Sequence, residues 1–366
     1  MDYEKQCAIA LSYLSGVGPI RAKKMLVRAG SFAEAVRLDA AELVGLKVPA
    51  KAIEQLVSGW AMQQAEREVA FAKTNGVRVY DCLDEAYPKR LADLPDSPLV
   101  LYVRGDRDLN ALRTVGIVGT RKPSPHGRHF CEQLVEQLSD YGVTVISGMA
   151  YGVDIAAHEA CLRTKTPTFA VMAHGLNEVY PSAHRASAAE VMKRGALVSE
   201  YPSGLRSRKE FFPQRNRIIA ALSDAVVVVE SARRGGSMIT ATLANGYARP
   251  VFAVPGRVAD KASQGCNELI KTNRANLLES AHDIAYLLGW HGRKRSVAEA
   301  KTGSLFEDVP PDERRVLNLL DGADALDVDT LLLRSELPSG QLAGVLLSLE
   351  LKGSVRALPG KRYAIT

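Results

Sequence analysis

The sequence predicts an α/β protein with a Rossmann-like parallel-sheet core, an N-terminal helical domain and a C-terminal winged helix. Three observations lead to this fold class. The first part of the chain has apolar residues at helical spacing, the middle alternates short apolar runs with helix-like stretches, and the end has three helical segments followed by a hairpin. Runs that are apolar at every position are typical of strands in a parallel sheet covered by helices on both faces. At 366 residues the chain is long enough for two or three domains.

Residues 1–75 are predicted to form a small helical domain of the helix-hairpin-helix or SAM-like type. Apolar residues from Ala8 to Leu14 recur at the period of a helix. The stretch Gly16-Val-Gly-Pro19 that follows suits a tight turn into a second helix, with proline in its first turn. Such a turn can present backbone N–H groups to a phosphate, or it can simply join two helices. Both interpretations stay open from the sequence.

Residues 76–288 are predicted to form the parallel-sheet core. Its expected strands are the apolar runs at residues 115–118, 143–146, 168–172, 196–198, 225–229 and 251–254. Helix-like stretches such as 128–141 and 155–163 separate these runs. In sheets of this kind ligands bind at the carboxyl ends of the strands, where loops meet helix N-termini. The chain's most informative residues lie in such loops.

A linker is expected over residues 289–309, and the winged helix over residues 310–366. The linker is polar, and its basic cluster at 293–295 is interpreted as solvated chain. The third helix of the winged helix is expected to begin at Ser339, as its N-cap, and to run to Leu351, with almost no basic residue. A helix that reads DNA normally carries Arg, Lys or Asn toward the groove. The pattern therefore favours a structural or protein-docking winged helix over a DNA reader.

Charge, cysteine content and hydropathy exclude several classes of protein. The formal charge is +6 and the pI about 9.0, a modest excess that favours an anionic partner only weakly. The five cysteines are scattered without a Cys-x-x-Cys pair, so neither a metal site nor a disulfide framework is predicted. The N-terminus lacks the pattern of a signal peptide, and the longest apolar runs are far too short to span a membrane. We expect a cytoplasmic protein without a membrane segment and without a cofactor.

The first candidate loop follows the strand predicted at 115–118. Gly119 lets the backbone approach a ligand closely, Thr120 offers a hydroxyl, and Arg121 offers a guanidinium fork for a phosphate. The loop is neither a Walker A motif nor a Gly-x-Gly-x-x-Gly fingerprint. ATP-driven chemistry through a P-loop is therefore not expected.

A second loop, residues 147–158, places Asp154 and His158 four residues apart on one helical face. This pair is compatible with catalysis or metal binding, but it lacks a third ligand. We favour a structural contact.

The densest basic stretch of the core is residues 206–217, with Arg206, Arg208, Lys209, Arg215 and Arg217 around Phe211 and Phe212. Basic side chains beside aromatic rings suit single-stranded nucleic acid, because phosphates need charge and unstacked bases need a flat partner. Lys209, Arg215 and Arg217 are candidate phosphate ligands, and the two phenylalanines are candidate stacking residues. The alternative is that the phenylalanines lie in the core and some arginines form structural ion pairs.

The fourth loop follows a strand that ends at Glu230. Gly236 opens a helix whose free N–H groups suit an anion, and the Ser237 hydroxyl adds a donor. Three of the four loops thus offer phosphate-binding chemistry, and none shows a motif for an activated nucleophile.

These stretches together resemble the DNA-processing protein A (DprA, or Smf) family. The resemblance covers residues 80–275 and rests on Ile117-Val-Gly-Thr-Arg, on residues 147–158, on Phe212-Pro-x-Arg-Asn-Arg-Ile-Ile-Ala and on Gly236-Ser-x-Ile-Thr-Ala. It implies cooperative binding of single-stranded DNA, a homodimer, and help in loading the RecA recombinase during natural transformation. By motif position it implies Arg121 as a phosphate ligand, with Lys209 second and Arg185 third.

The chain departs from the family pattern at two places. Ala173-His174 stands in a loop that is usually richer in glycine, and Tyr151 stands where arginine is commoner. The first change affects the detail of that loop and leaves the predicted fold unchanged.

An enzyme is the alternative interpretation. Phosphoribohydrolases on related nucleotide-binding folds carry a Gly-Gly-x-Gly-Thr-x-x-Glu loop, whereas residues 235–240 here read Gly-Gly-Ser-Met-Ile-Thr without the glutamate. The acid for glycosidic cleavage is missing from its expected place, and we therefore predict a binding protein.

Overall fold

The computed structural model describes residues 2–205, 207–290, 310–320, 326–352, 354–358 and 361–365. Its contacts divide the chain into two compact units, Met1–Lys294 and Arg295–Thr366. Each unit is described by itself. Most of the predicted linker, residues 291–309, lies outside the described residues, as does Arg206.

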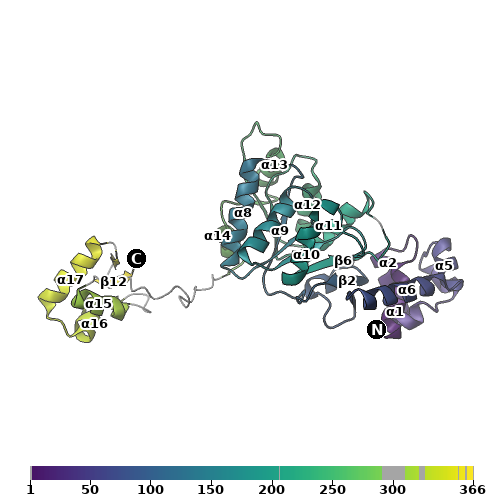
Figure 1. Ribbon diagram of the computed structural model, residues 1–366, viewed down its shortest axis with the longest axis horizontal. Helices are drawn as coiled ribbons and strands as arrows, with labels where there is room; N and C mark the ends of the chain where they lie inside the picture. The colour runs from purple at the N-terminus through teal and green to yellow at the C-terminus, as the bar shows by residue number, and fades with distance from the viewer. Residues whose placement is uncertain are drawn as a thin grey trace. The chain divides into compact units, whose positions relative to one another are not determined.

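The first 75 residues form the predicted helices. They are α1 (Tyr3–Ser12), α2 (Pro19–Ala29), α3 (Phe32–Ala35), α4 (Ala40–Gly45), α5 (Ala50–Val57) and α6 (Trp60–Thr74). Local capping sets several of their starts: the Asp2 side chain accepts a hydrogen bond from the Lys5 N–H at α1, and Asp39 and Glu42 form a capping box at α4. These helices share one hydrophobic core with the edge of the sheet that follows, and they lie together in Figure 1.

A nine-stranded sheet forms the centre of the first unit. Its strands are β1 (Arg78–Asp81), β2 (Val100–Arg104), β3 (Thr114–Val118), β4 (Thr144–Ser147), β5 (Thr168–Val171), β6 (Ala196–Ser199), β7 (Ala225–Val228), β8 (Val251–Ala253) and β9 (Asn276–Leu277). The order is β1-β2-β6-β5-β4-β3-β7-β8-β9, and only the pairs β1–β2 and β2–β6 are antiparallel. The six predicted runs are β3 to β8, whereas β1, β2 and β9 were not predicted.

Helices cover both faces of the sheet. They are α7 (Lys89–Ala92), α8 (Pro125–Ser139), α9 (Val153–Thr164), α10 (Arg185–Arg194), α11 (Phe211–Leu222), α12 (Gly236–Gly246), α13 (Gln264–Lys271) and α14 (Ala281–Leu287), with a short 3₁₀ helix at Ser182–His184. Val226 and Val228 pack in one core cluster and Val227 in the other, because successive side chains of a strand point to opposite faces. This two-sided burial confirms the predicted α/β core.

The order of the strands reverses beside β3. The chain runs outward from β3 through β4, β5 and β6, and then returns to pair β7 with the other side of β3. The loops after β3 and β7 therefore lie side by side, and the Thr120 N–H donates to the Glu230 carbonyl at 2.7 Å. Ligands of doubly wound sheets bind at such a reversal.

The second unit is a winged helix, as predicted. It contains α15 (Pro311–Leu320), α16 (Val328–Ser335) and α17 (Ser339–Leu351), with strands β10 (Leu326–Asp327), β11 (Val355–Leu358) and β12 (Arg362–Ile365) in the order β10-β12-β11. Helix α17 begins at Ser339 itself, and Pro338 rather than Ser339 occupies the cap position. Gln341, Leu347 and Glu350 are exposed on α17, so the helix shows solvent no basic side chain from Ser339 to Leu351. Within the described parts of both units, no helix is long and apolar enough to cross a membrane.

Candidate nucleic-acid interface

The loops at the carboxyl ends of β3 and β4 are packed tightly against each other. Gly152 has φ +87°, and a Cβ there would lie 2.2 Å from the Thr120 carbonyl oxygen. The Val153 N–H donates to that same carbonyl at 3.1 Å. A Cβ at Gly119 would lie 2.5 Å from the Val153 side chain, so Gly119 makes room for helix α9 rather than for a ligand. The two loops therefore form one rigid ledge.

Arg121 lies at the tip of this ledge. Its side chain is exposed, and its guanidinium carbon lies 5.4 Å from the centre of the Phe212 ring. The Thr120 hydroxyl oxygen accepts a hydrogen bond from the Lys122 N–H at 3.2 Å, which shapes the turn that presents Arg121. A guanidinium above an aromatic ring keeps its N–H groups available for a phosphate.

The two phenylalanines at the start of α11 are both half-buried. Phe211 stacks on Tyr201 with ring centres 4.3 Å apart, and the Arg208 guanidinium lies over its ring at 5.8 Å. Phe212 makes an edge contact with the half-exposed Tyr180 at 6.1 Å. The sequence left open whether these phenylalanines stack on a base or lie in the core. Each ring has one packed side and some exposed surface, so each has features of both.

Arg215, in contrast, is buried in the core. Its guanidinium donates to the carbonyl of Gly148 at 2.6 Å and to the carbonyl of Val171, at the ends of β4 and β5. Asp154, whose carboxylate accepts from the Gly148 and Ala150 N–H groups, is its buried counter-charge. Burial raises the pKa of Asp154 and lowers the pKa of Arg215, and each charge opposes the shift of the other. These contacts leave Arg215 turned away from solvent.

Arg217 also has an internal partner. It forms an ion pair with Glu200, and both side chains are only 12% exposed. Burial raises the pKa of the Glu200 carboxyl, which Arg217 opposes. The pair joins α11 to the loop after β6, so Arg217 is engaged inside the protein.

The remaining predicted residues fall into two groups. Arg185 and Lys209 are exposed, as is Gly236 at the first turn of α12. Ser237 is buried, and its hydroxyl donates to the Ser231 hydroxyl at 2.8 Å. The exposed members of the predicted set are therefore Arg121, Arg185, Lys209 and Gly236.

The structure adds basic residues that the sequence reasoning did not select. Lys122 and Arg128 are exposed near Arg121, and Arg233 and Arg234 are exposed just before α12. Arg121, Lys122 and Arg128 line a hollow of about 700 Å³ together with Tyr151. The sequence shows these basic residues in the Lys122-Pro and Arg233-Arg stretches. Only their exposure in the structure distinguishes them from arginines that are buried inside the protein.

Comparison with known proteins identifies the family of the chain. The sequence model of the protein family described as DNA recombination-mediator protein A matches residues 78–289. The sequence model of the DprA winged helix domain matches residues 300–361. The chain belongs to the DNA recombination-mediator protein A family.

Relatives in this family cover most of the chain. The Synechocystis protein Smf is 30% identical over 392 residues, covering 97% of each chain. DNA processing protein DprA of Streptococcus pneumoniae is 35% identical over 246 residues, covering 67% of this chain and 84% of its own. The S. pneumoniae DprA crystal structure superposes with a TM-score of 0.65 and 28% identity, covering 80% of this chain and 99% of that one.

A solved Helicobacter pylori structure of DNA processing protein A, described for its single-stranded DNA binding mode, is also similar. It has a TM-score of 0.53 and 31% identity, and the match covers 59% of this chain and 97% of that one.

In this member of the family, Asp154 and His158 have separate structural partners. The His158 ring is buried, and its Nδ1 lies 2.8 Å from the Thr168 hydroxyl. Burial, with the positive charge of Arg215 nearby, lowers the pKa of His158 to about 3. The residues that the structure describes contain no group of three His, Cys, Asp or Glu side chains able to hold a metal ion. The structural interpretation of this pair is therefore favoured.

The strand-order reversal holds an anion that belongs to the protein itself. The carboxylate of Glu230, 7% exposed, accepts from the Ser124 N–H at 2.8 Å and from the Ser124 hydroxyl at 2.5 Å, at the N-terminus of α8. A Cβ at Gly127 would lie 2.5 Å from this carboxyl group. In nucleotide-binding folds a phosphate takes that position at the helix N-terminus. The Glu230 carboxylate therefore lies at the kind of helix N-terminus where nucleotide-binding folds hold a phosphate.

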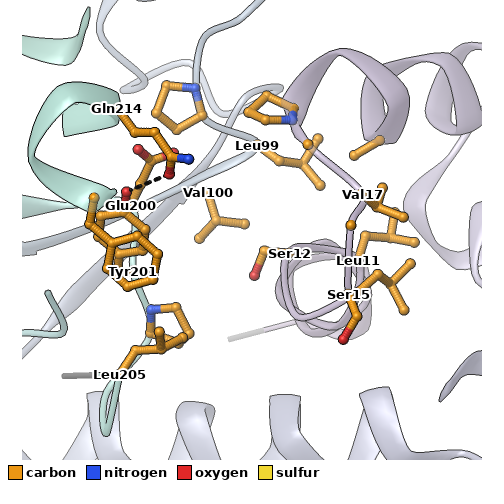
Figure 2. Close-up of a pocket in the computed structure, with 18 of the residues that line it drawn as sticks. Leu11, Ser12, Ser15, Val17, Leu99, Val100, Glu200, Tyr201, Leu205 and Gln214 are labelled. Carbon is orange, nitrogen blue, oxygen red and sulfur yellow. Dashed lines mark hydrogen bonds between the residues drawn. The ribbon is translucent and has the colours of Figure 1, made fainter. Parts of the chain in front are cut away.

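A second hollow, of about 540 Å³, lies between the α1–α2 turn and the loop after β6 (Figure 2). Leu11, Val17 and Leu99 line one side, and Tyr201, whose hydroxyl donates to the Gln214 side-chain oxygen at 3.1 Å, lies on the other. Among the described residues that line it, Arg208 is the only cation and Glu200 the only carboxylate. The described lining offers a phosphate a single cation, and the helix-hairpin-helix interpretation of the turn stays a prediction.

Proposed function

We propose that this protein, as a recombination mediator, binds single-stranded DNA along the ledge formed by the loops after β3 and β4 and along the neighbouring loops after β5 and β6. The observation that carries the proposal is the exposed Arg121 guanidinium above the half-buried Phe212 ring. A cation beside an aromatic face is the pairing that single strands need, since every unstacked base has a π-face and every nucleotide a phosphate. The H. pylori relative, described for its single-stranded DNA binding mode, supports it.

Within this proposal Arg121, Lys209 and Arg185 hold phosphates and Phe212 stacks on a base. All three cations are exposed, and Gly236 leaves the start of α12 open to an anion. Arg215 and Arg217 position the loops instead, because their N–H groups are taken up by carbonyls and by Glu200. Ser237 has the same internal role through Ser231.

The proposed role is non-enzymatic. A phosphoribohydrolase-like reaction needs the phosphate of a nucleotide at the strand-order reversal, where the Glu230 carboxylate lies on the N-terminus of α8. A second anion there meets a buried like charge, which is costly at short range. This geometry supports binding over nucleotide cleavage.

The family supplies the partners in this proposal. We propose a cytoplasmic homodimer that protects incoming single strands and helps to load RecA onto them in recombination and natural transformation. The supporting fact is membership of a family described as recombination mediators. Light scattering of the purified chain tests the dimer, and RecA filament formation on a protein-covered strand tests the loading. The winged helix, with no basic side chain exposed on α17, is proposed to bind protein rather than DNA.

The test of the DNA site is an Arg121→Ala variant titrated into a labelled single strand at several salt concentrations. If Arg121 makes one phosphate contact, the affinity falls and the slope of log K against log salt decreases by about 0.7. Arg163→Ala is the matched control, since Arg163 is exposed at the far end of α9 and pairs with Glu132 on the surface. An unchanged affinity and slope for Arg121→Ala would remove Arg121 from the site.

A further inference from the structure

We propose that the hollow beside Arg121 is a further nucleotide subsite, in which a base stacks on Tyr151 while Lys122 and Arg128 hold phosphate. The inference rests on the proposed single-strand binding and extends it to a residue at which this chain differs from the pattern of its family. The ligand is one nucleotide of a single strand already held at Arg121.

The Tyr151 ring is available for a base. It is 49% exposed, and its aromatic contact is an edge-to-face arrangement with His184, at 4.8 Å and 71°. His184 is buried, and because a carbonyl only accepts, its Nδ1 donates to the Met149 carbonyl at 2.8 Å. The histidine thus braces one side of the tyrosine and leaves the rest of the ring in solvent. A half-exposed, braced aromatic ring is a suitable stacking surface.

The backbone fixes this ring relative to Arg121. Tyr151 directly precedes Gly152, whose positive φ and close approach to Thr120 hold the two loops together. The Val153 N–H bond to the Thr120 carbonyl completes the lock. The platform is therefore preorganised beside the phosphate ligand, which lowers the entropy cost of binding.

The charge around the hollow suits a phosphate. Arg121, Lys122 and Arg128 are exposed on its walls, against the single carboxylate of Glu159. The Arg128–Glu159 pair is long, at 4.0 Å, with both side chains more than 40% exposed, so it competes weakly with a phosphate. The volume of about 700 Å³ lies in the range of small-molecule sites.

The experiment compares wild type, Tyr151→Ala and Tyr151→Phe on two probes of equal length, an oligo-dT and a fully abasic phosphodiester strand. We expect Tyr151→Ala to weaken binding of oligo-dT about fivefold or more, which is the low end for one stacked base. Tyr151→Phe keeps the ring and the affinity. The abasic strand binds wild type and Tyr151→Ala equally, and the salt slope is unchanged, because stacking involves no counterion.

Two controls sharpen the result. Tyr286→Ala removes a tyrosine that is 81% exposed and lies near His282 on α14, away from the ledge, and binds as wild type does. Lys122→Ala lowers the salt slope by about 0.7 on both probes. Thermal unfolding of each variant confirms that the fold is kept.

The outcomes separate the inference from the proposed function. If Tyr151→Ala binds oligo-dT as tightly as wild type while Arg121→Ala is weakened, the subsite is wrong and the DNA site at Arg121 stands. An equal loss on oligo-dT and on the abasic strand also overturns stacking, because the effect then acts through the backbone or the charge. If wild type binds neither probe, the inference and the proposed function fail together.

Discussion

Two arginines lie against the same ring and have different roles. Arg121 approaches Phe212 to 5.4 Å from the loop after β3, and Arg215 approaches it to 6.0 Å from within α11. Arg121 is exposed, whereas Arg215 is 3% exposed and its N–H groups donate to the Gly148 and Val171 carbonyls. An aromatic neighbour and a basic side chain therefore do not define a DNA contact. Solvent access and free N–H donors do.

The largest effect is expected from Arg215→Ala. The substitution leaves the Asp154 carboxylate buried without its counter-charge and frees two strand-end carbonyls, so the free energy of unfolding falls by about 3–5 kcal/mol. Arg215→Lys rescues little, because an ammonium does not reproduce the planar fork. Urea unfolding measures both. A loss below about 1 kcal/mol for Arg215→Ala would show that the residue is not structural.

The next effect concerns His158, which burial, together with the positive charge of Arg215, keeps neutral. The pKa of His158 in the folded protein is about 3, below its unfolded value of about 6.5. The stability that neutral His158 contributes is complete above pH 6.5 and is lost as the pH falls toward 3. Between pH 7 and pH 5 wild type loses about 2 kcal/mol more stability than His158→Asn. Urea unfolding of both proteins at the two pH values checks this, and equal losses would contradict the low pKa.

A smaller effect is expected from a substitution of Phe212, the ring that both arginines approach. Phe212→Leu keeps apolar bulk beside both arginines but removes the flat face for a base, so the binding free energy for a single strand weakens by about 1 kcal/mol. Fluorescence anisotropy measures the change, and unfolding in urea shows whether the core is intact. Unchanged affinity would place the strand elsewhere on the ledge.

The smallest effect has the opposite sign. Glu159→Gln removes the one carboxylate beside Arg121, Lys122 and Arg128, so single-strand binding strengthens by less than about 1 kcal/mol. Salt screens interactions between exposed charges, and the gain disappears at high salt. Weaker binding at low salt would mean that Glu159 orients Arg128 for the strand.

Part of the fold and the position of Arg121 could be predicted from the sequence. Fully apolar runs predicted β3 to β8, because burial on both faces of a parallel sheet leaves that pattern. Strands β1 and β9, at the two edges of the sheet, lack that pattern, and β2 lies outside the alternation of strand and helix. The position of Arg121 directly after a predicted strand placed it at the ligand-binding edge of the sheet.

The sequence could not predict which of the other arginines have internal partners. Arg215 and Arg217 lie two residues apart in one helix, but Arg215 donates to backbone carbonyls at the ends of β4 and β5, and Arg217 pairs with Glu200. Those partners are distant in sequence, so periodicity and composition do not report them. Tyr151 was visible as a departure from a family pattern, but its exposure and its contact with His184 needed the structure.

The most direct test of the account is the strand preference of the wild-type protein. A labelled single strand and a duplex of the same sequence are titrated with wild type and with Arg121→Ala over a range of salt concentrations. The account predicts that wild type prefers the single strand, with a salt-dependent affinity that Arg121→Ala lowers. Equal binding to both strand states, or an affinity that Arg121→Ala leaves unchanged, would contradict it.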